Sequence, residues 1–361
     1  MSSACVRSDE PEVLCRVIGC AGIMTLNRPK VLNALNLQMI RTIRIALDTW
    51  EDDHHVKCVI VEGAGDKAFC AGGDVRAMRQ KAITGHYDEA LTFWREEYQL
   101  NSRIFHYTKP YIALLDGIVM GGGAGLSLHG RYRVGTHKLV FAMPETGIGL
   151  FPDVGVGYVL ARLPHATGEW LALTGERLNL AQSHQLGIIT HGVQSTSLHE
   201  IRERICGGEN IDTLLSTFAC DHDDTIHETN ENIIRTCFDA PDLLTVLSKL
   251  TQQAPHDAFA KQMLDHLKTR CPLSLLITHE HIKRSRQLSF DEVLMMDYRL
   301  IAHMVQEPDF HEGVRAVVVD KDQKPRWHYQ LGELDHQHII KRMFGGFEPM
   351  ATRLLEAKGT A

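Results

Sequence analysis

The 361-residue sequence lacks the patterns that mark several common classes of protein. It has no Cys-x-x-Cys pair, and its nine cysteines are an odd number scattered along the chain, which favours free thiols in a reducing compartment over a disulfide framework. No apolar run approaches the roughly 18 residues needed to cross a bilayer, so we expect no membrane partner. The net charge of -7 gives no global basic surface, and we expect no nucleic-acid partner.

Several cofactor and catalytic motifs are also missing. The glycine run that begins at Gly121 departs from the dinucleotide pattern Gly-x-Gly-x-x-Gly at Leu126, and no Gly-Lys-Ser/Thr follows for a P-loop. A nucleophile elbow fails because His129 occupies its last glycine position, which argues against a serine hydrolase. The His-Glu-His stretch at 279–281 has no shared helix face, and His-Glu-x-x-His is absent. We therefore predict no metal site.

What the sequence does contain is an alternation of short apolar runs, glycine loops and amphipathic helices. This order of strand, loop, helix and strand favours a parallel sheet and an α/β architecture. Beyond about residue 200, strand-like runs become rare and helical stretches dominate, so we expect a boundary near 200–215. The expected strands lie near 13–18, 22–27, 56–61, 111–115, 132–134 and 139–142, and the expected helices near 37–52, 86–106, 241–250 and 258–268.

Two glycine loops each follow an expected strand and precede an expected helix. They are Ala71-Gly72-Gly73-Asp74 and Gly121-Gly122-Gly123. Backbone N–H groups at a helix N-terminus are free to donate, and two such donors from separate loops could form an oxyanion hole. From spacing alone, the alternative stays open that these glycines only permit tight turns and close packing.

Two carboxylates stand in a stretch rich in apolar residues, proline and glycine at 141–158. Glu145 and Asp153 each follow a proline there, and an apolar setting penalises the charged form of a carboxylate. Such groups could act as base, nucleophile or positioning group. The alternative is that Glu145 caps a helix and Asp153 begins the next one. On the helix near 86–106, Glu96 and Glu97 differ by about 100° in direction, so only one can face a cleft.

Longer motifs resemble the enoyl-CoA hydratase/isomerase (crotonase) superfamily, and within it the 3-hydroxyisobutyryl-CoA hydrolase family. The resemblance extends from about residue 12 to residue 327, and its motifs fall in the order that this family uses. These motifs lie at 26–29, 69–74, 93–98, 121–123, 141–158, 309–316 and 320–327.

The resemblance implies a fold class, α/β, built as a crotonase-like spiral of strand–strand–helix turns with a mainly helical C-terminal region. We expect 10–210 to form the spiral core with the active site, and 211–345 to form a helical region packed on it. It implies an acyl-CoA substrate and no cofactor. The oligomeric state stays open, with a homo-oligomer as one option. The family's role in valine degradation implies the mitochondrial matrix, although the N-terminus is a weak transit peptide and the alternative is the cytoplasm.

The resemblance also implies roles for individual residues. The peptide N–H groups of Gly73 and Gly122 would polarise the thioester carbonyl. Hydratases of the superfamily use two glutamates, but here Gly125 stands at the first position and only the second, Glu145, is present. The hydrolase family shares this loss and adds an acid at Asp153, so the expected reaction is thioester hydrolysis. Glu145 would either attack the thioester carbonyl to form an anhydride or activate a water molecule.

Further residues of the expected site follow from the same motifs. Asp153 would contact the substrate hydroxyl or position water, and Glu97 is the family's additional carboxylate near the acyl group. The family commonly has glycine where Val156 stands and proline where Ala161 stands, and we expect the bulk of Val156 to affect the acyl end. The remaining residues expected to bind substrate are Ala71, Gly72, Asp74 and Gly121.

Two other functions stay open at this point. One is a hydratase- or isomerase-type enzyme of the same superfamily, which Gly125 and Asp153 argue against. The other is a hydrolase-like protein associated with mitochondrial ribosomes, since relatives of the hydrolase occur there. The negative net charge and the retained Glu145 argue against that role.

Overall fold

The computed structural model describes residues 10–220 and 225–345, and these contain two β-sheets. The larger sheet has the strand order β1-β2-β3-β5-β7-β9, in which β1 is antiparallel to β2 and all other neighbours are parallel. The smaller sheet has the parallel order β4-β6-β8. The strands are β1 (Val13–Ile18), β2 (Ala21–Leu26), β3 (Cys58–Gly63), β4 (Ala68–Cys70), β5 (Tyr111–Leu115), β6 (Ile118–Met120), β7 (Tyr132–Thr136), β8 (Val140–Ala142) and β9 (His191–Val193).

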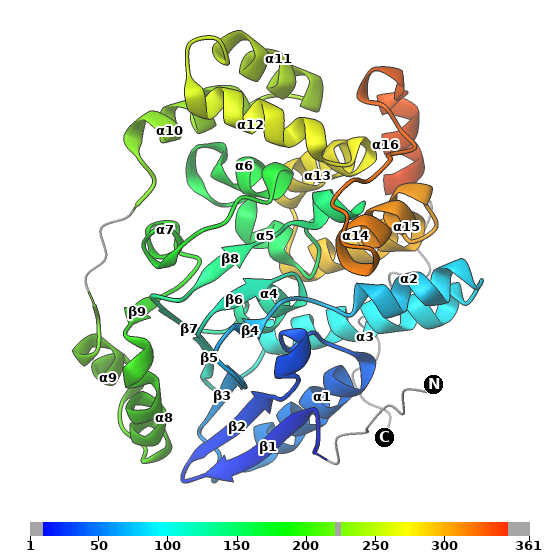
Figure 1. Ribbon diagram of the computed structural model, residues 1–361. Coiled ribbons are helices and arrows are strands. Elements are labelled where there is room, and N and C mark those ends of the chain that lie inside the picture. Colours follow the sequence, from blue (N-terminus) through cyan, green and yellow to red (C-terminus); the bar gives the residue numbers. More distant parts are fainter. Residues whose placement is uncertain (1–9, 221–224, 346–361) are drawn as a thin grey trace.

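Successive turns of the chain each supply one strand to the larger sheet, one strand to the smaller sheet and then a helix. The first such turn is β3, β4 and the helices α2 (Val75–Ile83) and α3 (Tyr87–Phe105). The second is β5, β6 and α4 (Gly122–Ser127), and the third is β7, β8 and, after a loop, α5 (Val156–Leu160). This arrangement confirms the expected spiral of strand–strand–helix turns (Figure 1).

Both faces of the larger sheet are covered by helices. On one face, strand residues such as Val59 and Ala113 pack in the main core with α1 (Leu37–Asp52) and α3. On the other face, a second core joins the sheet to α8 (Leu198–Cys206) and α9 (Ile211–Thr217). A parallel sheet that is buried on both faces needs apolar residues at consecutive positions. This explains why all five residues of β5 are apolar and buried.

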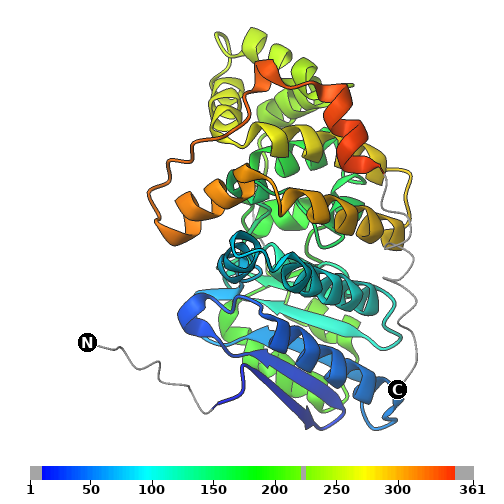
Figure 2. The same cartoon turned by 90° about the vertical axis from the view of Figure 1, so that its right-hand side faces the viewer.

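The C-terminal part is mainly helical, as expected, and lies above the sheets in Figure 2. No helix in 10–220 or 225–345 is long and apolar enough to cross a membrane. The division at 210/211 stays a proposal. The remaining helices are α6 (Thr167–Thr174), α7 (Leu180–Gln185), α10 (Glu228–Ile233), α11 (Leu243–Gln253), α12 (Ala258–Thr269), α13 (Pro272–Ser285), α14 (Phe290–Met304), α15 (Pro308–Val314) and α16 (His336–Phe344), with a π-helical turn at Arg315–Val319 after α15.

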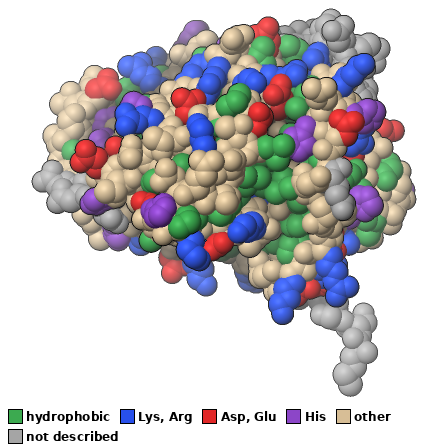
Figure 3. Space-filling view, turned by 90° about the horizontal axis from the view of Figure 1, so that it is seen from above, with side chains coloured by type: hydrophobic (Ala, Val, Ile, Leu, Met, Phe, Trp, Pro, Cys, Tyr) green, Lys and Arg blue, Asp and Glu red, His purple; other side chains and the backbone are tan. Residues whose placement is uncertain are grey.

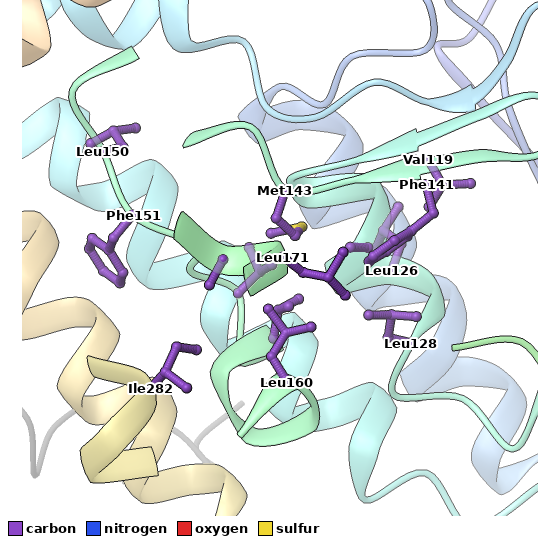
Figure 4. Packing of buried hydrophobic residues seen from close by; sticks show 14 of the residues in the cluster. Val119, Leu126, Leu128, Phe141, Met143, Leu150, Phe151, Leu160, Leu171 and Ile282 are labelled. Carbon is purple, nitrogen blue, oxygen red and sulfur yellow. The ribbon is translucent and has the colours of Figure 1, made fainter. Parts of the chain in front are cut away.

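A dense apolar core supports the loop that follows β8. Met143, Leu150 and Phe151 of this loop point into the same core as Leu171 of α6 and Ile282 of α13 (Figure 4). Because these residues come from segments far apart in the sequence, the loop is fixed from several sides. On the face drawn in Figure 3, Lys and Arg side chains are interspersed with Asp and Glu side chains rather than gathered into one basic patch.

Candidate active site

Three loops leave the same edge of the smaller sheet. The strands β4, β6 and β8 are parallel neighbours, so their carboxyl ends lie side by side. β4 leads into 71–74, β6 leads into Gly121 and Gly122, and β8 leads through Pro144 into a 3-10 turn at Glu145–Ile148. Ligands of open α/β sheets bind at the carboxyl ends of strands for this reason. The two glycine loops predicted to converge are therefore adjacent.

The backbone geometry of these loops brings two N–H groups close together. Gly121 has φ +48°, a left-handed conformation that favours glycine, and the chain turns there into α4. A Cβ placed on Gly122 would lie 3.4 Å from the Gly73 nitrogen. Within the described ranges, neither the Gly73 nor the Gly122 N–H donates to another protein group. Both amides are thus free to donate to a bound molecule.

Three carboxylates are buried beside these amides. Glu97 of α3 is 2% exposed, and Glu145 and Asp153 are each 6% exposed. Among the described residues, Glu97 Oε1 and Glu145 Oε2 have no hydrogen-bond partner. The Tyr98 hydroxyl donates to Asp153 Oδ2 at 2.6 Å. A buried carboxylate oxygen without a partner is costly, which indicates that these two oxygens serve a bound ligand or a reaction.

Burial and mutual repulsion change the pKa of all three carboxyl groups. Burial, and then the charges of Asp153 and Glu145, raise the pKa of Glu97 well above its ordinary value. Burial and the charge of Asp153 raise the pKa of Glu145 in the same way. Burial raises the pKa of Asp153 to about 7, and the hydrogen bond from Tyr98 partly offsets this rise. With its pKa near neutrality, Asp153 can exchange a proton with a substrate at physiological pH.

The site opens into a pocket of about 700 Å³. All nine residues that the sequence predicted for catalysis or substrate binding line this pocket: Ala71, Gly72, Gly73, Asp74, Glu97, Gly121, Gly122, Glu145 and Asp153. Apolar side chains such as Leu32, Trp94 and Leu150 form much of the wall. Lys30 and Lys321 also line it and are exposed, so they lie toward the solvent side.

Neither carboxylate of the 141–158 stretch is a helix cap. Glu145 begins the 3-10 turn without a side-chain capping bond, and α5 has Gly155 rather than Asp153 as its N-cap residue. Asp74 does cap a helix, because its side chain accepts from Ala77 N at 3.2 Å at the start of α2. The alternative reading is therefore wrong for Glu145 and Asp153, whereas Asp74 combines a structural contact with a position in the pocket wall.

The two adjacent glutamates on α3 separate as predicted. Glu97 faces the pocket, whereas Glu96 pairs with Arg41 through two hydrogen bonds of 2.8 and 2.7 Å. The burial of only one of them follows from the 100° rotation between adjacent helical residues.

The C-terminal region holds the turn that carries Glu145. A Cβ on Gly149 would lie 2.3 Å from the Asp309 carbonyl oxygen, and a Cβ on Gly313 would lie 2.4 Å from the Ile148 carbonyl carbon. α15 therefore packs directly on the backbone of the turn. Cys271 N also donates to Thr146 O at 2.9 Å from the start of α13. The motif at 309–316 thus supports the backbone of the turn that carries Glu145.

The position of the missing glutamate is closed. A Cβ on Gly125 would lie 2.8 Å from Asn101 Nδ2 and 2.9 Å from Val154 Cβ. Both distances are too short for a side chain at this position without movement of its neighbours. The side chains of Asn101 and Val154 thus occupy the space that a glutamate at position 125 would need.

The sequence of this chain is similar to those of known enzymes that act on acyl-CoA thioesters. A family model described as enoyl-CoA hydratase/isomerase matches residues 21–344. A protein named 3-hydroxyisobutyryl-CoA hydrolase, mitochondrial, from Rattus norvegicus is 44% identical over 330 residues, which are 89% of this chain and 85% of the relative. The chain belongs to the 3-hydroxyisobutyryl-CoA hydrolase family of the enoyl-CoA hydratase/isomerase superfamily. The protein of the same name from Homo sapiens is 45% identical over 326 residues, 88% of this chain and 84% of that relative.

Solved structures of other superfamily members share the fold of this hydrolase-family chain. A structure described as a carnitinyl-CoA dehydratase from Mycobacterium thermoresistibile has a TM-score of 0.88 and 34% identity, covering 94% of this chain and 98% of its own. One described as an enoyl-CoA hydratase from Rhodobacter sphaeroides 2.4.1 has a TM-score of 0.86 and 32% identity, with the same coverage. The fold class predicted from the sequence is therefore confirmed.

The structure also brings residues to the hydrolase-family site that the sequence reasoning missed. Tyr98 lies within the motif at 93–98, and its position directly after Glu97 was the available signal. Val318 and Lys321 line the pocket from the segment after α15. Lys321 lies within the motif at 320–327, whereas Val318 lies in none of the motifs. Val156 is fully buried at the start of α5 and is not among the described residues that line the pocket, so its effect on the acyl end stays a prediction.

Proposed function

We propose that the protein hydrolyses the thioester of 3-hydroxyisobutyryl-CoA to 3-hydroxyisobutyrate and CoA in valine catabolism. The observation that carries this proposal is the group of three buried carboxylates beside two free backbone amides, with no room for a fourth carboxylate at Gly125. A hydratase needs an acid/base pair to add water across a double bond. A thioesterase needs one nucleophile or base and an oxyanion site, which this arrangement can supply.

The oxyanion site would consist of the Gly73 and Gly122 N–H groups. Their proximity and their lack of protein acceptors support this assignment. The thioester carbonyl oxygen would accept from both amides as negative charge develops on it. The loss of one such donor costs about 2.7–4 kcal/mol in the transition state. The pair would therefore supply a large share of the rate enhancement.

Glu145 would act on the thioester carbon in one of two ways. As a nucleophile, its carboxylate oxygen bonds to that carbon, the C–S bond breaks, and CoA leaves as a thiolate that takes up a proton. Water then cleaves the resulting anhydride and restores the carboxylate. As a general base, Glu145 takes a proton from a water molecule whose oxygen bonds to the carbonyl carbon. The C–S bond then breaks, and CoA leaves as a thiolate that takes up the proton from Glu145. Its buried, unpartnered Oε2 is compatible with both routes.

The other two carboxyl groups would recognise the 3-hydroxyl group of the acyl chain. A hydroxyl both donates and accepts, so it is best held between an ionised and a protonated carboxyl group. Burial and the charges of Asp153 and Glu145 raise the pKa of Glu97 and so favour its protonated form, which would be the donor. Asp153, with its pKa of about 7, would be the acceptor when ionised, or it would position water. This pairing favours hydroxyacyl over plain acyl substrates.

The CoA portion would be held by the solvent side of the pocket. Lys30, Arg76 and Lys321 are exposed cations that line it, and CoA carries several phosphate charges. Neither a metal nor a redox cofactor has a part in the proposed chemistry. The relatives named above are described as mitochondrial, and we propose the mitochondrial matrix as the compartment.

A substrate panel tests this function. Free CoA release is measured with 3-hydroxyisobutyryl-CoA, 3-hydroxypropionyl-CoA and isobutyryl-CoA, the last of which lacks the hydroxyl group. We expect rapid release from the first, and from the second if the 2-methyl group contributes little. We expect slow release from the third. No release from either hydroxyacyl-CoA would refute the proposed function.

Hydration is the second candidate, because the solved relatives are described as a hydratase and a dehydratase. The same preparation is assayed for hydration of crotonyl-CoA and dehydration of carnitinyl-CoA. Under the proposed function both rates are negligible beside thioester cleavage. A hydration rate above the cleavage rate would replace hydrolysis with hydration as the function.

A further inference from the structure

The peptide group that follows Asp153 is held at both of its polar ends by buried side chains. His129 Nε2 lies 2.7 Å from the carbonyl oxygen of Val154. Gly155 N, on the other side of the same peptide bond, donates to Asp297 Oδ2 at 2.8 Å. His129 follows α4, whereas Asp297 lies in α14, so two distant parts of the chain fix one peptide plane.

This peptide group needs an external hold because Val154 is in an unfavourable conformation. Its φ is +54°, in the left-handed region, where a β-branched residue is rarely found. Such a conformation costs about 1–3 kcal/mol and persists only where surrounding contacts enforce it. The hydrogen bonds to Val154 O and from Gly155 N are the contacts that can enforce it. These two contacts are at the first and second residues after Asp153.

A second histidine supports Asp297 from behind. His281 Nε2 lies 2.6 Å from Asp297 Oδ1, and both side chains are fully buried. The His281 ring packs so closely on α5 that a Cβ on Gly157 would lie 2.3 Å from its Cε1 atom. Both oxygens of Asp297 therefore have a donor. The result is a continuous set of contacts from α13 through α14 to the peptide after Asp153.

We propose that His129, Asp297 and His281 are positioning residues that hold the Asp153 carboxylate in its reactive orientation. None of the three lines the pocket described above, so they act through the 154–155 peptide rather than on the substrate. This inference rests on the proposed role of Asp153 in the hydrolysis. It assigns a function to buried polar groups that the thioesterase chemistry itself does not use.

The charges around Asp153 add a second consequence. The titratable groups that face it are Glu97 and Tyr98 from α3, Glu145 from the 3-10 turn and Asp297 from α14. After burial, the negative charge of Asp297 is a further cause that raises the pKa of Asp153. Burial lowers the pKa of His129 to about 4, so its ring is neutral at pH 7 and donates through Nε2.

Two substitutions at Asp297 separate its hydrogen bond with Gly155 N from the effect of its negative charge on Asp153. In Asp297→Asn the amide oxygen can still accept from Gly155 N. The new amide nitrogen can donate to His281 Nε2 if the histidine proton moves to Nδ1, which has no partner among the described residues. Asp297→Ala removes the hold. We expect Asp297→Ala to lower kcat by about 10–100-fold, since a displacement of about 1 Å can cost 100-fold. Asp297→Asn should retain most of kcat.

The pH profile distinguishes this role from a merely structural one. Loss of the negative charge lowers the pKa of Asp153, so the acidic limb of kcat should move to lower pH in Asp297→Asn. Thr278→Val is the matched control, because Thr278 is fully buried on α13 and its hydroxyl has no partner in the described ranges. If both Asp297 variants keep the kcat and the pH profile of this control, the inference is wrong.

His129 offers a test if the Asp297 variants do not fold. His129→Gln keeps an N–H donor for Val154 O, and His129→Leu removes it. We expect His129→Gln to retain more kcat than His129→Leu at similar Tm, and hydrogen exchange of the peptide at 150–158 to be faster in His129→Leu. Equal kcat and equal exchange would overturn the inference. Exchange does not need turnover, so a wild type that cleaves no thioester would refute the proposed function and leave this test valid.

Discussion

The hydroxyl of Tyr98 donates to Oδ2 of Asp153 at 2.6 Å, and this bond joins α3 to the loop after β8. The residue before Tyr98 is Glu97, whose carboxyl group lies in the same pocket. Two adjacent residues of α3 thus serve the site: Glu97 contributes its own carboxyl group, and Tyr98 donates a hydrogen bond to the carboxyl group of Asp153. This donor lowers the pKa of Asp153 against the stronger effect of burial.

Removal of the Tyr98 hydroxyl should raise the pKa of Asp153, because its hydrogen bond lowers that pKa. In Tyr98→Phe the pKa of Asp153 rises further, so the acidic limb of the kcat profile moves to higher pH. We expect kcat at pH 7 to fall about tenfold, since a hydrogen bond to a charged group is worth about 1.5–3 kcal/mol. The control is Tyr107→Phe, whose hydroxyl donates to Leu47 O away from the pocket. An unchanged pH profile in Tyr98→Phe would contradict the role of this bond.

The buried acid at Asp153 should also destabilise the fold at neutral pH. Its pKa of about 7 in the folded state exceeds the ordinary value of about 3.9. Stability therefore falls as pH rises from about 4 to 7, and the cost is then constant. Asp153→Asn should raise Tm at pH 8 by about 2–5 °C while it lowers activity. The gain should shrink toward pH 5.

Asp212→Asn is the matched control for this stability test. Asp212 also accepts a hydrogen bond from a tyrosine, Tyr132, at 2.8 Å, but its side chain is 65% exposed. We expect little change in Tm from this control. Differential scanning calorimetry over pH 5–8 makes the comparison. A Tm of Asp153→Asn at or below that of wild type at pH 8 would contradict the claim that the ionised Asp153 carboxylate destabilises the folded state.

Restoring the glutamate of the hydratases should not restore hydration. In Gly125→Glu the new Cβ would lie 2.8 Å from Asn101 Nδ2 and 2.9 Å from Val154 Cβ, so these neighbours must shift. We expect a loss of about 1–3 kcal/mol in the free energy of unfolding, as is usual for overpacking. Gly125→Ala measures the steric part alone. Crotonyl-CoA hydration and urea unfolding are measured, and efficient hydration by Gly125→Glu would show that the site can accommodate this carboxylate.

The exposed cation Lys321 should contribute to CoA binding rather than to chemistry. In Lys321→Glu we expect KM to rise about threefold to tenfold with little change in kcat, corresponding to about 1 kcal/mol for an exposed charge contact. Salt should weaken the difference. The pantetheine thioester of 3-hydroxyisobutyrate lacks the nucleotide phosphates of CoA and serves as the control. An equal rise in KM for that substrate would contradict a phosphate contact.

The sequence predicted the longer elements well because their apolar periodicity is strong. The helix expected at 37–52 is α1 (Leu37–Asp52), and the helix expected near 86–106 is α3 (Tyr87–Phe105). The smaller sheet was predicted only in part, because β4 and β6 have three residues each and show no period of their own. Yet this sheet brings the three site loops together. Its pairings join residues 50 positions apart, such as Ala68 and Ile118, or 22 positions apart, such as Ile118 and Val140.

The site residues were predictable where they belong to motifs, and were missed where they depend on distant contacts. Asp297 lies 142 positions from Gly155, so no local pattern can relate them. His129 entered the sequence reasoning only as a residue that interrupts a motif, although its ring holds the Val154 carbonyl. The His-Glu-His stretch at 279–281 was considered as a metal site, whereas His281 contacts Asp297.

The most direct test of the account concerns Glu145. Single-turnover release of CoA from 3-hydroxyisobutyryl-CoA is measured for wild type, Glu145→Gln and the control Glu96→Gln, whose side chain contacts Arg41 outside the pocket. We expect Glu145→Gln to bind substrate but to release CoA at least about 1,000-fold more slowly, as is typical for the loss of a central catalytic group. Glu96→Gln should behave like wild type. Release of CoA by Glu145→Gln at the wild-type rate would contradict the central claim.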